Sequence, residues 1–136
     1  MKIIEKIIDG IGTLSRNTPI IITDYPDDKI FVELKDIAAA RYMEYIEVLM
    51  VQLNDCELRE LLYGMPGHPS TFLDGTKLIN FRMKKSMSLT TLIPFLMNNN
   101  HIVCLTFEAD TDDSVIENFD MAIINRCIIL DYNSTL

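Results

Sequence analysis

Acidic side chains are concentrated in one short stretch of this 136-residue chain. Six carboxylates lie between residues 108 and 120, at Glu108, Asp110, Asp112, Asp113, Glu117 and Asp120. Carboxylates can stabilise the start of a helix, ligate a divalent cation or attract a basic protein surface. This stretch is therefore the first candidate for a functional site.

Three interpretations of the acidic stretch are open. The spacing Ser114-x-x-Glu117 is a capping box, so the acids can belong to the start of a helix and its solvated face. An acidic surface can instead dock a basic protein, because complementary charge accelerates encounter and excludes wrong partners. A divalent-metal site would use Asp110 and Asp112, which follow an apolar run, where parallel α/β sheets place ligand sites.

The metal interpretation does not extend to an EF-hand loop. Val115 stands where that loop requires glycine, and Met121 stands where it requires the terminal glutamate. We therefore expect the six acids to contact a basic protein partner, and we expect no cofactor.

Familiar catalytic motifs are missing from the chain. It contains no glycine-rich phosphate loop, no G-x-S-x-G and no Cys-x-x-Cys pair. One glycine- and proline-rich loop, residues 64–75, carries His68, Ser70 and Asp74. A nucleophile and its base usually come from separate elements, so we interpret His68 as an exposed loop residue and predict no enzyme activity.

Composition excludes several classes of partner. The chain has 20 acidic and 12 basic residues, a net charge of −8, and 49% hydrophobic residues. The apolar content is typical of a globular protein, and the length fits one α/β domain over residues 1–136. An acidic balance disfavours nucleic acids and anionic membranes as ligands. The N-terminal apolar run is interrupted by Glu5, Lys6 and Asp9, so we expect no signal peptide.

The three cysteines predict a reducing compartment. Cys56, Cys104 and Cys127 are odd in number and widely spaced, unlike a disulfide framework. Cys104 and Cys127 lie within apolar runs, which predicts buried free thiols. We therefore expect a cytoplasmic protein.

The first half of the chain predicts mixed elements. Isoleucines at helical spacing predict an amphipathic helix over 3–14. Short β-branched runs at 19–23 and 30–34, separated by turn-forming residues, predict a hairpin. A long, mostly apolar helix is expected over 36–53, with Asp36 as its N-cap, followed by a short helix ending at Tyr63.

The second half predicts an alternation of strands and helices. Strands are expected at 76–83, 101–107 and 127–132, and helices at 88–97 and 114–124. Continuous apolar strands separated by helices pair in parallel with both faces covered. The fold class is therefore α/β, with a β-α-β-α-β C-terminal half and a mainly parallel sheet.

These features favour an acidic protein-binding module. The physical type matches a stoichiometric inhibitor, such as an immunity protein that neutralises a basic toxin or nuclease. One alternative is a chaperone or adaptor that binds an extended segment through the apolar helix 36–53 or a sheet edge. Another is a metal-dependent enzyme that uses Asp110 and Asp112.

Overall fold

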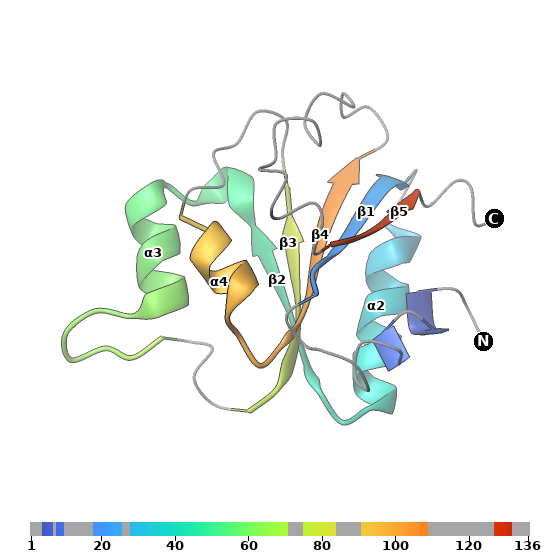
Figure 1. Ribbon diagram of the computed structural model, residues 1–136, viewed down its shortest axis with the longest axis horizontal. Helices are drawn as coiled ribbons and strands as arrows, with labels where there is room; N and C mark the ends of the chain where they lie inside the picture. Colours follow the sequence, from blue (N-terminus) through green and yellow to red (C-terminus); the bar gives the residue numbers. More distant parts are fainter. Residues whose placement is uncertain are drawn as a thin grey trace.

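Five parallel strands form one sheet at the centre of the protein (Figure 1). The structure is a computed structural model and describes residues 4–6, 8–9, 18–25, 28–70, 75–83, 91–108 and 127–131. The strands are β1 (Ile20–Tyr25), β2 (Glu44–Leu49), β3 (Lys77–Arg82), β4 (Ile102–Glu108) and β5 (Ile128–Asp131). Their order across the sheet is β2-β3-β4-β1-β5, which confirms the α/β fold with parallel pairing.

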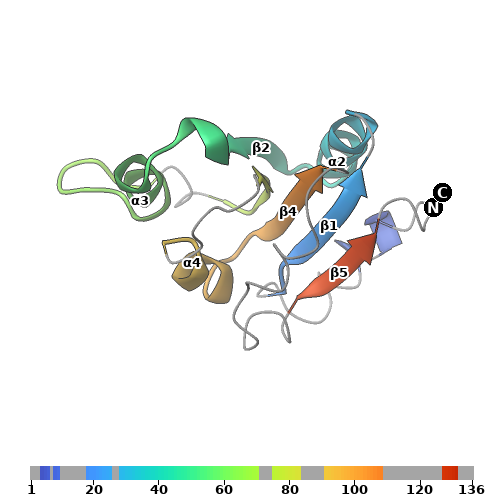
Figure 2. The same ribbon diagram turned by 90° about the horizontal axis from the view of Figure 1, so that it is seen from above.

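Helices cover both faces of this sheet (Figure 2). The described helices are α2 (Lys29–Ala40), α3 (Asp55–Tyr63) and α4 (Ile93–Met97), with a 3-10 turn, η1 (Met50–Gln52), after β2. Residues 4–6 and 8–9 are also helical. Helix α2 lies on one face, and α3 and α4 lie on the other.

One core lies between the sheet and α2. Ile30, Leu34 and Ile37 recur at helical spacing in α2 and are buried against Ile20 and Cys104 of the central strands. Ile4 and Ile8, four residues apart, join the same cluster. The predicted N-terminal amphipathic helix therefore buries its isoleucine stripe where the structure describes it.

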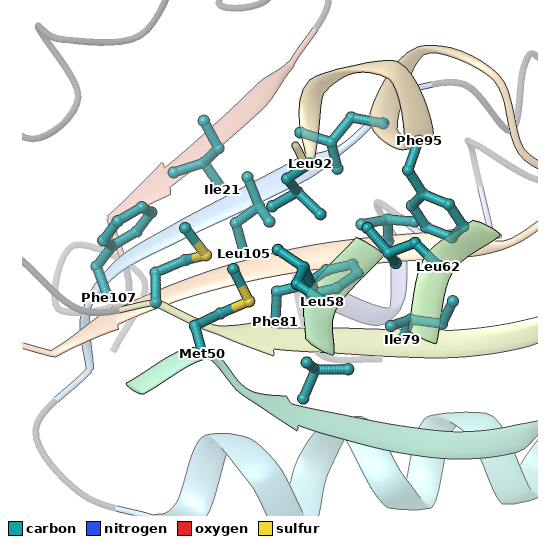
Figure 3. Close-up of a cluster of buried hydrophobic side chains, with 14 residues drawn as sticks. Ile21, Met50, Leu58, Leu62, Ile79, Phe81, Leu92, Phe95, Leu105 and Phe107 are labelled. Carbon is teal, nitrogen blue, oxygen red and sulfur yellow. The ribbon is translucent and has the colours of Figure 1, made fainter. Parts of the chain in front are cut away.

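A second core lies between the sheet and the helices α3 and α4 (Figure 3). Phe81 of β3 is fully buried, and its ring meets the ring of Phe95 edge to face, with centroids 6.0 Å apart. Leu58 and Leu62, four residues apart on α3, complete this contact. Alternate residues of β3 and β4 thus pack into opposite cores. Both faces of these strands are therefore covered, which explains why the sequences of the strands are nearly continuously apolar.

Most predicted elements of the second half are confirmed. Strands β3, β4 and β5 occupy the runs expected at 76–83, 101–107 and 127–132. Helix α4 begins at Ile93, with Pro94 in its first turn, where a missing N–H is harmless. The helix predicted over 114–124 lies outside the described residues.

The predicted hairpin and the predicted long helix are both wrong. Residues 30–34 belong to α2, so the stripe of Ile30, Leu34 and Ile37 is helical instead of β. The apolar run expected as one helix over 36–53 divides into the end of α2, strand β2 and η1. The chain turns at Tyr42, which has φ +56°. Glycine usually takes this conformation, and the sequence has no glycine here to indicate the turn.

Helix α3 ends at Tyr63, as the sequence predicts, and Asn54 caps its start. Asn54 accepts a hydrogen bond from the amide of Glu57, whose carboxylate accepts one from the amide of Asn54. At the other end, Gly64 has φ +78°, and a Cβ there would approach the Ser70 nitrogen to 2.7 Å. Glycine at this position therefore permits both the turn and the close approach of the following loop.

The cysteines are free thiols of unequal exposure. Cys104 is fully buried, Cys127 is partly buried and Cys56 is exposed. Burial raises the pKa of Cys104 to about 12 and that of Cys127 to about 11. The folded state therefore favours the neutral thiols, in agreement with their prediction as small apolar core residues.

Alkaline pH is expected to destabilise the protein through Cys104. A raised folded-state pKa stabilises the protein fully below the unfolded-state pKa of about 8.5, and that stabilisation is lost as pH rises towards the folded-state value. Each pH unit in this window lowers the folding equilibrium constant by up to about tenfold for this thiol. Urea unfolding of the wild type and Cys104→Ala at pH 8 and pH 10.5 measures the difference. Equal pH dependence in both proteins would contradict the assignment.

Candidate functional site

At the carboxyl edge of the sheet, two neighbouring strands have connections that lead to opposite sides of the sheet. The chain leaves β1 towards β2 at one edge of the sheet and leaves β4 towards β5 at the other (Figure 1). Because β1 and β4 are neighbours, this change of side falls between their carboxyl ends, which we call the switch point. Parallel α/β folds bind their ligands at such points.

One predicted site residue lies at the switch point. Glu108 is the last residue of β4 and pairs with Tyr25, the last residue of β1, after a register shift between Ile22 and Tyr25. The other five predicted contact residues lie outside the described residues: Asp110, Asp112, Asp113, Glu117 and Asp120. The structure therefore places the first residue of the acidic stretch. The docking face formed by all six acids stays a prediction.

Sequence reasoning misplaced two acids, one at the end of β1 and one at the start of α2. Asp24 is the next-to-last residue of β1, and Asp28 is the exposed N-cap of α2, whose side chain makes no capping hydrogen bond. These residues were interpreted as the turn of a hairpin, which hid their place beside β4. The available signal was the length of the apolar run before them, which suits a buried parallel strand.

The segment from β1 to α2 has the order of a phosphate-binding strand–loop–helix unit. Lys29 opens α2, as the lysine of such a unit does. The two glycine positions of that motif hold Thr23 and Asp28, and its hydroxyl position holds Ile30, which is fully buried. The segment therefore lacks the glycines and the hydroxyl with which that motif binds a phosphate.

A chain of hydrogen-bonded polar side chains, of which Asn80 and Thr106 are fully buried, lies beneath the carboxyl edge on the α2 face. The hydroxyl of Thr106 donates to Oδ1 of Asn80 over 2.9 Å, and Nδ2 of Asn80 donates to the hydroxyl of Tyr45 over 3.2 Å. The hydroxyl of Tyr45 donates in turn to Glu47 over 2.9 Å. Burial raises the pKa of Tyr45, so the phenol remains a neutral donor. This network links β2, β3 and β4 across the sheet.

Arg82 extends this polar group towards α2. Its guanidinium carbon lies 4.1 Å from the ring centroid of Phe31, in the first turns of α2. Its Nη1 lies 3.9 Å from the carboxylate of Glu47, and its buried Nε has no hydrogen-bond partner in the part of the chain that the structure describes. The stacked arginine holds the start of α2 against β3, beside the switch point.

The loop considered for catalysis is described at His68 and Ser70. His68 is exposed, and its backbone N–H and C=O both pair with Met65 in a tight turn. The hydroxyl of Ser70 donates to the carbonyl of Leu61 over 3.0 Å, and Asp74 lies outside the described residues. The interpretation of His68 as an exposed loop residue is confirmed.

The described residues contain no group of three His, Cys, Asp or Glu side chains that could hold a metal ion. No helix among them has the length and apolar character needed to cross a bilayer.

The chain matches no protein-family model, no curated protein and no solved structure.

Proposed function

We propose that this protein is an acidic binding module. It would bind a basic surface of another protein at the carboxyl edge of its own sheet. One observation carries the proposal: the neighbouring central strands β1 and β4 end side by side, with Tyr25 paired to Glu108, and acidic residues follow both in the sequence. The acids of the second strand are the six predicted contacts, from Glu108 to Asp120. Their charge would meet a basic partner at the point where folds of this class bind ligands.

Charge distribution supports a basic protein as the ligand. The chain carries a net charge of −8, and residues 101–136 contain seven acids and one base, Arg126. The resulting field repels nucleic acids and attracts basic proteins at a distance. A stoichiometric inhibitor of a basic toxin or nuclease, such as an immunity protein, is the function that fits this field. Free thiols and a reducing compartment fit a cytoplasmic location.

Reversing two acids outside the capping box is expected to slow association with the partner. In Asp110→Lys/Asp120→Lys, Ser114 and Glu117 are kept, so the predicted helix start is undisturbed. Affinity purification from the native host identifies the partner, and stopped-flow kinetics with the purified pair measure the association rate. We expect a decrease of about tenfold at low salt that shrinks as salt screens the charges.

A charge-matched control separates local contact from net charge. Asp36→Lys/Glu60→Lys makes the same change in net charge on exposed positions of α2 and α3. This control is expected to keep an association rate within about threefold of the wild type, since charges distant from a contact are screened. Equal rates for the two double variants would contradict a docking surface at residues 108–120.

The same pairing of strand ends supports a second candidate function, a metal-dependent enzyme. Asp110 and Asp112 follow β4 closely in the sequence, and their carboxylate oxygens would suit Mg²⁺. This function predicts that Mg²⁺ or Mn²⁺ raises the melting temperature of the wild type and leaves that of Asp110→Lys/Asp120→Lys unchanged. The chaperone alternative loses one of its two proposed binding surfaces, because residues 36–53 do not form one apolar helix, and it keeps the other, a sheet edge.

A further inference from the structure

A cavity of about 480 Å³ opens at the amino edge of the sheet, opposite the switch point. Ile8, Met43 and Ile102 provide apolar walls, Asp9 and Arg41 provide charged ones, and Tyr42 and Thr76 complete the lining. The turn from α2 to β2 supplies Arg41, Tyr42 and Met43, at the lower end of the sheet in Figure 1. The cavity therefore lies at the edge of the sheet opposite Glu108.

Tyr42 is fully exposed although it occupies an unfavourable backbone conformation. Its relative exposure is 100%, and its φ of +56° lies in the left-handed region that favours glycine. Its amide donates to the carbonyl of Ala39, so the turn closes α2 in the manner of a glycine C-cap. Fold stability alone would favour glycine here. An exposed aromatic ring kept at such a position is available to a ligand.

Arg41 in the cavity wall pairs with two carboxylates, Asp9 in the same wall and Glu5 outside it, so this ion-pair cluster carries one net negative charge. Arg41 donates to Oδ1 of Asp9 through Nε at 2.9 Å and Nη2 at 2.6 Å, and to Glu5 at 3.3 Å. Two carboxylates thus face one guanidinium, and the Asp9 side chain is 43% exposed against 21% for Arg41. Among the described residues, no hydrogen bond reaches the other oxygen of Asp9, Oδ2. The carboxyl end of α2 adds the negative end of its helix dipole.

We propose that this cavity binds a lysine or arginine side chain of a protein partner. The aliphatic stem would lie on Ile8, Met43 and Ile102, while the cationic head would lie between the Tyr42 ring and Oδ2 of Asp9. The added positive charge would balance the excess carboxylate. The proposal rests on the proposed function only for the source of this side chain, a basic protein.

Small probes test the cavity without the partner. We expect Nα-acetyl-arginine N-methylamide to shift the amide resonances of Met43, Thr76 and Ile102 in ¹⁵N-labelled protein. The uncharged Nα-acetyl-norleucine N-methylamide has a similar apolar stem and should bind at least about fivefold more weakly, because it lacks the cation–π and carboxylate contacts. Inorganic phosphate should leave these resonances unchanged.

Three variants assign the binding energy to Tyr42 and Asp9. Tyr42→Gly removes the ring and relieves the positive φ, so it should remain folded and bind the arginine probe about two- to fivefold more weakly. Tyr42→Phe keeps the aromatic face and should bind within about twofold of the wild type. Asp9→Asn, with its fold checked by circular dichroism, should also weaken binding.

Each outcome supports or overturns the proposal. Equal binding of the norleucine and arginine probes would identify an apolar pocket, and unchanged binding by Tyr42→Gly would remove the ring from the site; either result overturns the proposal. If the cavity fails while Asp110→Lys/Asp120→Lys still slows association, the docking surface stands without the cavity. If the probes bind the cavity while that double variant associates normally, the cavity stands and the docking surface fails.

Discussion

Phe81→Ala is expected to lower the free energy of unfolding by about 3–5 kcal/mol, the usual cost of truncating a buried phenylalanine. Phe81 is fully buried in β3, and its ring meets Phe95 of α4 edge to face (Figure 3). Truncation removes apolar contacts and leaves a cavity between the sheet and both helices of that face. A domain of ordinary stability, about 5–15 kcal/mol, would become marginal.

Two further variants show whether this loss comes from the core contact. Phe81→Leu keeps much of the apolar volume and should cost roughly half as much as the alanine variant. Val51→Ala changes an exposed residue of η1 and should alter stability by less than about 0.5 kcal/mol. Urea unfolding of all three variants measures these differences. A loss below about 1 kcal/mol for Phe81→Ala would contradict the packing of β3 against α3 and α4.

The parallel strands of the second half were predictable because they are buried on both faces. In β4, residues from Ile102 to Phe107 are all buried, so the strand has no polar alternation to confuse with a helix. Edge strand β5 follows the same pattern more weakly, since Ile129 is 47% exposed. In these strands, the apolar run alone was enough to predict the strand.

The errors in the first half have a common physical cause. β-Branched and aromatic residues at 30–34 favour a strand locally, but packing on the sheet selects the helical stripe of Ile30, Leu34 and Ile37. The end of α2 then falls at Tyr42, where a non-glycine residue takes a positive φ. Rules that look for glycine or proline cannot find such a stop, so α2 and β2 were joined into one helix.

The part of the candidate site that lies at the end of β4 was predictable, because β4 itself was predictable. Glu108 follows an apolar run that any parallel-sheet interpretation places at a carboxyl edge. Asp24 became part of the same edge only when the order β2-β3-β4-β1-β5 placed β1 beside β4. The pairing joins residues more than eighty positions apart, and no local pattern encodes it.

The hydrogen bond between Thr106 and Asn80 gives the second large expected effect. Both side chains are fully buried, and the Thr106 hydroxyl donates to Asn80 Oδ1 over 2.9 Å. Thr106→Val leaves that oxygen without this donor, and Asn80→Leu leaves the hydroxyl without this acceptor. We expect each substitution to cost about 1–3 kcal/mol, because a buried polar group left unpaired loses its full hydration.

The double variant Asn80→Leu/Thr106→Val is expected to cost less than the sum of the two single changes. Removing both polar groups leaves neither buried and unpaired, so the two losses should couple by about 1–3 kcal/mol in a double-mutant cycle. Tyr45 loses the hydrogen bond from Nδ2 in both Asn80 variants, so its contribution cancels in the coupling term. Urea unfolding of the four proteins measures the coupling. Strict additivity would show that the buried hydrogen bond between β3 and β4 contributes nothing to the stability of the sheet beneath the switch point.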